Sequence, residues 1–139
     1  MLGLARRSCR LWHRDRLREE LRERRAARTA WESLSETSDV LFSIVRAQYD
    51  GYPLRYPQHL RSRRNLHVYS YMVAKYTLRW GFYRVAARLC CKRNHIPLCE
   101  VVNPRKDYKL TEVALRYQID PIAFERICHK LRRVWPLLP

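Results

Sequence analysis

The chain has 139 residues, with 29 lysines and arginines against 13 aspartates and glutamates, for a formal net charge of +16. This length suits one hydrophobic core. The charge far exceeds the magnitude of about 2 to 8 that suits a small soluble domain, so we expect a polyanionic partner to neutralise it. Only three glycines occur, which excludes a glycine-rich phosphate loop, and no apolar run approaches the roughly 18 residues of a membrane span.

Arginine supplies 24 of the 29 cationic side chains. Its planar guanidinium binds phosphate or carboxylate through two parallel hydrogen bonds, whereas lysine offers a point charge. The excess of arginine therefore favours a partner that carries phosphates or carboxylates, although codon bias would produce the same composition.

The cysteines and the first residues bear on location. The five cysteines are an odd number and two are adjacent, which favours a reducing compartment. Residues 1–14 carry four arginines and no acid, the composition of a mitochondrial presequence, and no secretory signal peptide is recognisable. We expect an intracellular protein, nuclear or mitochondrial, that is not secreted.

The first predicted element is a long polar helix over residues 4–32, and residues 1–34 are interpreted as an extension of a helical domain at 35–139. Arg16 and Glu20 have ion-pair spacing on this helix. Its apolar stripe is thin, so we expect the helix to be solvated, to project from the body or to lie along a partner.

A second helix follows, with Ser35 and Thr37 as candidate caps and an end near residue 50. The prolines of residues 52–64 cannot lie inside a helix, so this segment is interpreted as a connector. Its aromatic and basic side chains are candidates for stacking on unpaired bases and for contacting phosphates. They are Tyr52, Arg55, Tyr56, His59, Arg61, Arg63 and Arg64.

The connector belongs to a longer block, Gly51 to Cys99, that contains ten lysines and arginines and no acid. Aromatic residues are interleaved with these cations. They are Tyr52, Tyr56, Tyr69, Tyr71, Tyr76, Trp80, Phe82 and Tyr83. A surface of one sign with aromatic rings is typical of proteins that bind polyanions.

A third helix is predicted over residues 65–93, where apolar residues recur at spacings of three and four on two sides. Such a helix is expected to be central and buried, with Tyr69, Tyr76, Trp80 and Tyr83 in the core. Its cations are expected to leave the core between the two stripes and to form exposed edges. Lys75, Arg79 and Arg93 would form one edge, and Arg84, Arg88 and Lys92 the other.

The last predicted element is a helical hairpin over residues 110–134. Asp120 is expected to cap its second helix, and Pro121 to occupy the first helical position. The apolar residues that follow it are expected to dock on the body or on a partner.

This hairpin resembles the helix-turn-helix of transposases and other DNA-binding domains. Val113, Ala114 and Tyr117 lie where the first helix packs, Ile119 and Asp120 lie in the turn, and Phe124, Ile127 and Leu131 face inward. The resemblance implies that Arg126, Lys130 and Arg133 point outward, toward a groove or a backbone.

The hairpin departs from that pattern at two places. Gln118 stands where such turns usually have glycine, and Ile122 and Ala123 in the exposed first turn read few base edges. A plain structural hairpin would have the same periodicity and remains an alternative.

Cysteines and histidines of the second half include the residue types of a zinc site, at Cys90, Cys91, His95, Cys99, Cys128 and His129. Their spacing is not that of a zinc ribbon or finger, so we interpret the thiols as small buried hydrophobes. No carboxylate or amide is in place to orient a histidine for a catalytic cysteine. We expect no metal, no cofactor and no enzymatic activity.

Together these observations predict an all-α fold, a small single-domain bundle of four to five helices with a long polar N-terminal helix, a buried central helix and a C-terminal hairpin like a helix-turn-helix. The predicted function is non-enzymatic binding of nucleic acid, mainly through its phosphate backbone, in a ribonucleoprotein or as a DNA-binding factor. The alternative is an interaction or effector-like protein whose basic surface docks on an acidic protein partner or an anionic membrane. The oligomeric state does not follow from the sequence.

Overall fold

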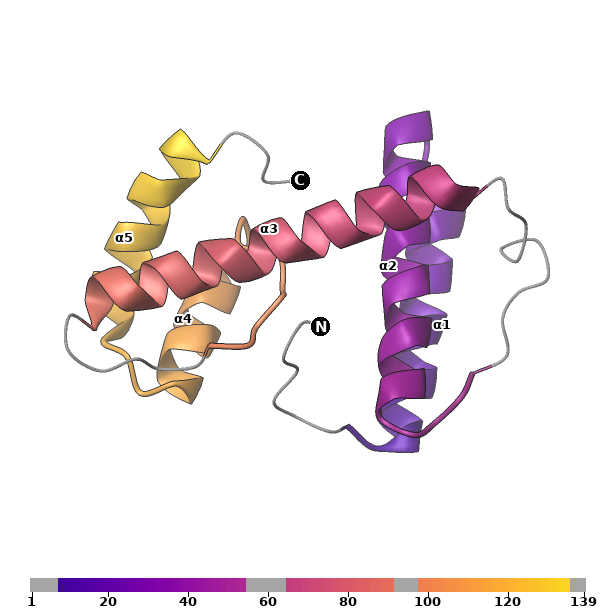
Figure 1. The fold of residues 1–139 in the computed structure, drawn as a ribbon, viewed down its shortest axis with the longest axis horizontal. Helices are drawn as coiled ribbons and strands as arrows, with labels where there is room; N and C mark the ends of the chain where they lie inside the picture. Colours follow the sequence, from indigo (N-terminus) through magenta and orange to yellow (C-terminus); the bar gives the residue numbers. More distant parts are fainter. Residues whose placement is uncertain (1–7, 55–64, 92–97, 136–139) are drawn as a thin grey trace. The chain divides into compact units, whose positions relative to one another are not determined.

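The computed structural model describes residues 8–54, 65–91 and 98–135. In these ranges the protein is all-α, with five helices and no strand, which confirms the predicted fold class. The helices are α1 (Arg10–Ala26), α2 (Ala30–Tyr49), α3 (Leu66–Cys90), α4 (Asp107–Arg116) and α5 (Pro121–Val134) (Figure 1). The chain forms two compact units that divide within α3. We call the described residues up to Ala74 the N-terminal unit and those from Lys75 onward the C-terminal unit.

The N-terminal unit is built on a hairpin of α1 and α2, which lie side by side (Figure 1). Buried apolar residues of α2, among them Val40, Leu41 and Ile44, form its core. The helix α2 ends at Tyr49. Two residues later, Gly51 has a φ of 88°, which glycine adopts without strain. The predicted end of this helix is confirmed.

The predicted continuous helix over residues 4–32 is wrong, because a capping box begins a new helix inside that range. The Thr29 side chain accepts a hydrogen bond from the Glu32 backbone N–H at 3.1 Å, and the Glu32 carboxylate accepts one from the Thr29 backbone N–H at 3.1 Å. This reciprocal pair satisfies amide groups that a helix start leaves open. Ser35 and Thr37, the predicted caps, lie inside α2.

The C-terminal unit packs α4 and α5 against the second part of α3. Its core contains Phe82 and Tyr83 from α3, Leu110 and Val113 from α4, and Phe124 from α5, all with exposed fractions of 2% or less. The hairpin is therefore held by a third helix and does not stand alone.

The third helix forms almost where it was predicted, but only one side of it is buried. Its buried apolar residues include Val68, Met72 and Tyr76 in addition to the aromatic pair of the C-terminal core. Leu66, at 73% exposed, and Val73, at 58%, belong to a predicted buried stripe but lie on the surface. The prediction of two buried stripes is wrong, because apolar side chains at the right spacing stay exposed where no neighbouring element covers them.

Candidate nucleic-acid interface

The turn between α4 and α5 has a left-handed residue where a helix-turn-helix usually carries glycine. Gln118 has a φ of 55°, and the backbone N–H of Ile119 then donates to the carbonyl of Ala114 at 2.9 Å. A left-handed residue after a helix satisfies the last carbonyls and redirects the chain. Glutamine adopts this left-handed conformation here, although its Cβ atom makes the conformation less favourable than it is for glycine.

The start of α5 follows the predicted signals. Asp120 caps the helix, accepting a hydrogen bond from the Ile122 backbone N–H at 3.0 Å, and Pro121 occupies the first helical position. Both predictions are confirmed, because a proline needs no hydrogen bond there and its φ is already helical.

The inner face of α5 fixes the orientation of the helix. Phe124 and Cys128 are completely buried, and the ring of Phe124 is stacked with that of Tyr83 at a centroid distance of 6.2 Å. Ile127 and Leu131 are partly buried against the same core. The predicted inward-facing residues are therefore confirmed, and the opposite side of α5 must face outward.

The outer face of α5 carries Arg126, Lys130 and Arg133, which we call the α5 face. All three side chains are exposed, and they lie on one side of the helix because they are spaced by four and three residues. Within the part of the chain that the structure describes, none of them makes a hydrogen bond or an ion pair. The resemblance implied this outward orientation, and the structure has it.

Acidic residues near the α5 face are engaged elsewhere. Glu125 lies 3.7 Å from His129, one turn along α5. Arg132 donates to Asp107 at 2.7 Å and to the carbonyl of Pro104. The Arg132 contact holds the pKa of the Asp107 carboxyl below its usual range. The Arg132 contacts tie α5 to Pro104 and to the first residue of α4, and no carboxylate of the described residues forms an ion pair with the α5 face.

The predicted cationic edges of α3 are not reproduced at Lys75 and Arg79, which are only 2% and 6% exposed. The guanidinium of Arg79 lies over the ring of Tyr76, 5.3 Å from its centroid. Lysine and arginine carry long apolar stems, so a packed helix face can cover them. Neither side chain is available as part of an exposed edge, and this part of the prediction is wrong.

The second predicted edge of α3 is partly described. Arg84 is half-buried, with its guanidinium 4.4 Å from the ring centroid of Trp80, and Arg88 is exposed near the end of the helix. Lys92 and Arg93 lie outside the described residues.

The predicted connector is also only partly described. Tyr52 is 37% exposed, and its ring centroid lies 6.0 Å from that of His13. The other candidates lie outside the described residues and stay predictions. They are Arg55, Tyr56, His59, Arg61, Arg63 and Arg64.

Sequence reasoning missed a set of cations on α1. Arg10, Arg14, Arg22 and Arg25 are exposed, and none makes a hydrogen bond or ion pair within the described ranges. The spacing of these arginines in the sequence could have indicated a cationic surface on α1. The acids that lie between them led to the prediction of a helix that is polar overall. Three of those four acids pair with other arginines: Glu19 and Glu20 with Arg16, and Asp15 with Arg18 at 3.0 Å.

In the described part of the chain, no cysteine lies in a group of three or more possible metal ligands. Burial raises the pKa of the Cys128 thiol to about 12, and burial also raises that of Cys90 to about 11. Both thiols are therefore mainly protonated at neutral pH, the form that is a poor nucleophile. The interpretation of Cys128 as a small buried hydrophobe agrees with its complete burial.

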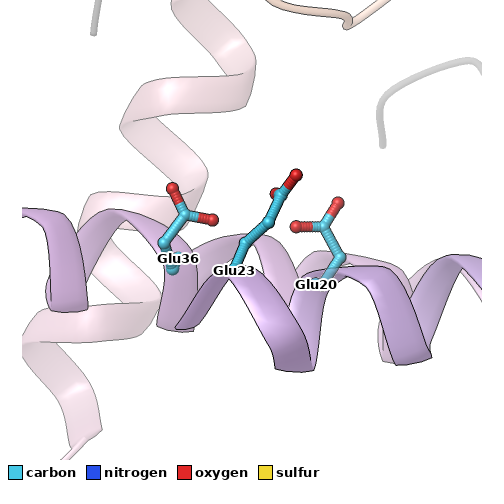
Figure 2. Close-up of side chains that lie close together, drawn as sticks. All are labelled: Glu20, Glu23 and Glu36. Atoms are coloured by element: carbon cyan, nitrogen blue, oxygen red, sulfur yellow. The ribbon is translucent and has the colours of Figure 1, made fainter. Parts of the chain in front are cut away.

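Three carboxylates of the N-terminal unit lie close together: Glu20 and Glu23 on α1, and Glu36 on α2 (Figure 2). One oxygen from each lies within 4.8 Å of the others, which is close enough to share a cation. Glu20 is 2% exposed and is ion-paired with Arg16. Burial raises the pKa of Glu20 to about 7, and the neighbouring carboxylates add to this effect. Because the positively charged Arg16 already pairs with Glu20, we assign no metal ion to these three carboxylates.

None of the helices in the described residues is both long enough and apolar enough to cross a membrane.

In comparisons with known proteins, no family model, no curated protein and no solved structure matched this chain.

Proposed function

We propose that this protein binds the phosphate backbone of nucleic acid through the α5 face and catalyses no reaction. The observation that carries the proposal is the set of three exposed cations, Arg126, Lys130 and Arg133, that have no acidic partner in the described residues. They extend from the second helix of a hairpin whose inward-facing residues agree with the helix-turn-helix resemblance, with a left-handed glutamine in the turn where glycine is usual. In that pattern the second helix is the one that meets the duplex.

The chemistry of the α5 face favours phosphates over bases. Long cationic side chains neutralise phosphates and release counterions, which gives affinity without reading sequence. The first turn of α5, where a recognition helix meets base edges, presents Ile122 at 69% exposed, and isoleucine has no hydrogen-bonding group for a base edge. Binding through this face should therefore depend on salt much more than on sequence.

A titration of the full chain tests the proposal. Fluorescence anisotropy is measured with a labelled DNA duplex and with an RNA duplex, from about 50 to 200 mM salt. The logarithm of the affinity should fall linearly with the logarithm of the salt concentration. The variant Arg126→Gln/Lys130→Gln should reduce the slope by about two for duplex DNA, since each lost phosphate contact removes about 0.9.

The matched control is Arg105→Gln/Lys106→Gln, which removes two exposed cations that lie outside the α5 face. Its slope should stay close to that of the wild type. Absence of binding by the wild type, or equal losses in the α5 variant and the control, would refute the proposal.

A further inference from the structure

We infer that α1 carries a second contact for the phosphate backbone of nucleic acid, formed by Arg10, Arg14, Arg22 and Arg25, which we call the α1 face. This inference rests on the proposed function for the nature of the ligand. It concerns the other compact unit of the chain, and the residues that carry it are different.

The α1 face is defined by which side of the helix packs. His13 and Glu20 are 2% exposed and Leu17 and Leu21 are half-buried, so they mark the side of α1 that contacts the rest of the unit. At 3.6 residues per turn, Arg14, Arg22 and Arg25 lie on the adjoining side of the helix, and Arg10, at the first helical position, lies in line with Leu17 and Leu21. All four are exposed.

The acids of α1 do not neutralise this face. Asp15 pairs with Arg18 at 3.0 Å, and Glu19 pairs with Arg16 at 2.7 Å. Glu20 also binds Arg16, on the buried side. Arg16 and Arg18 thus engage three of the four acids of α1, and the fourth, Glu23, lies with Glu20 and Glu36. The four arginines of the α1 face keep their charge and their hydrogen-bond donors for an external partner.

The shape of the α1 face suits a repeating anion. From Arg14 to Arg25 the helix rises about 16 Å, at 1.5 Å per residue. A DNA strand has a phosphate about every 3.4 Å along the duplex axis, so about five phosphates per strand pass over this length. A guanidinium can bind a phosphate through two hydrogen bonds, which makes arginine well suited to this contact.

A membrane surface fits the α1 face less well. Helices that lie on membranes bury a free apolar face among the lipids. On α1, Leu17 and Leu21 are half-buried in the protein, and the exposed large apolar side chains are Leu11, at 63%, and Trp12, at 45%, both in the first turn. The guanidinium of Arg46 lies over the Trp12 ring, 5.6 Å from its centroid. Apolar side chains are exposed only in the first turn of α1, among the described residues, whereas the arginines extend to its last turn, and this distribution favours a phosphate backbone.

The test uses Arg14→Gln/Arg22→Gln in the full chain, with the same duplexes and salt range as above. We expect the salt slope for duplex DNA to fall by about two, as for the α5 variant, while Arg105→Gln/Lys106→Gln stays near the wild type. The variant Arg14→Lys/Arg22→Lys keeps the charges and should keep the slope. Far-UV circular dichroism should show the same helix content in every variant.

The possible results separate the two proposals. A slope equal to that of the control would overturn the α1 contact and leave the proposed function standing if the α5 variant still loses slope. A lower salt slope in Arg14→Lys/Arg22→Lys would also overturn the α1 contact, because this variant keeps both positive charges. Weaker binding to phosphatidylserine vesicles with unchanged nucleic-acid binding would overturn it in favour of a membrane. Failure of the wild type to bind either duplex would refute both proposals.

Discussion

The Nε2 atom of His13 lies 2.9 Å from the Oδ2 atom of Asp50, and both side chains are almost completely buried. The same carboxylate oxygen accepts a hydrogen bond from the backbone N–H of Ser8 at 3.0 Å. Asp50 follows α2 directly, and His13 lies in the first turn of α1. The contact therefore fastens the open end of the α1–α2 hairpin, opposite the capped turn at Thr29.

Removing this fastening should destabilise the N-terminal unit. We expect Asp50→Ala to lower the free energy of unfolding by about 3 kcal/mol, because the buried His13 ring and the Ser8 N–H lose their acceptor. Urea denaturation followed by circular dichroism measures the change. Asp15→Ala serves as the control, since its pair with Arg18 is more than half exposed on both sides and should cost less than about 1 kcal/mol. Similar losses in both variants would contradict this interpretation.

Glu20 should make stability depend on pH. Its pKa in the folded protein is raised from 4.5 to about 7, chiefly by burial, so folding favours the protonated carboxyl. The unfolded chain loses this proton near pH 4.5 and the folded chain only near pH 7, so stability should fall across that interval and level off above it.

Glu20→Gln, which stays neutral, should be more stable than the wild type above pH 7, by about 1 to 3 kcal/mol. The advantage should shrink toward pH 5. Thermal unfolding at several pH values measures it. Glu19→Gln removes an exposed carboxylate from the same helix and should show a smaller change over this range. An advantage of Glu20→Gln that does not vary with pH would exclude titration of Glu20 as its cause.

Gln118→Gly should stabilise the C-terminal unit. The φ of 55° at Gln118 is costly for a residue with a side chain and free of strain for glycine. The gain is partly offset by the greater freedom of glycine in the unfolded chain, so we expect about 0.5 to 1 kcal/mol in urea denaturation. Gln118→Val should destabilise, because branching at Cβ disfavours the left-handed region further. The opposite order of the two variants would show that the turn is not left-handed in solution.

The thiols should differ in reactivity. Cys9 is exposed, whereas Cys128 is completely buried and burial raises its pKa to about 12. We expect iodoacetamide at pH 8 to modify Cys9 well before Cys128 in the native protein, because alkylation requires an accessible thiolate. Peptide mass spectrometry over time measures the order, and denatured protein serves as the control in which the difference disappears.

The sequence predicted well wherever a signal is local. Asp120 with Pro121 marked the start of α5, and Asp50 with Gly51 marked the end of α2, because caps and turns depend on neighbouring residues alone. The alternation of inward apolar and outward basic residues on α5 was also readable, since one helix face there meets one core. The break between α1 and α2 had a local signal as well, in Thr29 and Glu32, but the helix-forming residues around it concealed it.

The sequence by itself determined the all-helical class, the C-terminal hairpin and the excess of positive charge. Only the tertiary structure decided which cations remain free. Lys75 and Arg79 are covered while Leu66 and Val73 are exposed, because burial depends on which face of α3 meets other elements. Likewise, Arg16 and Arg18 of α1 form ion pairs with carboxylates of the same helix, whereas Arg14 and Arg22 form none in the described residues. Composition counts charges, but only packing and pairing determine which of them can reach a partner.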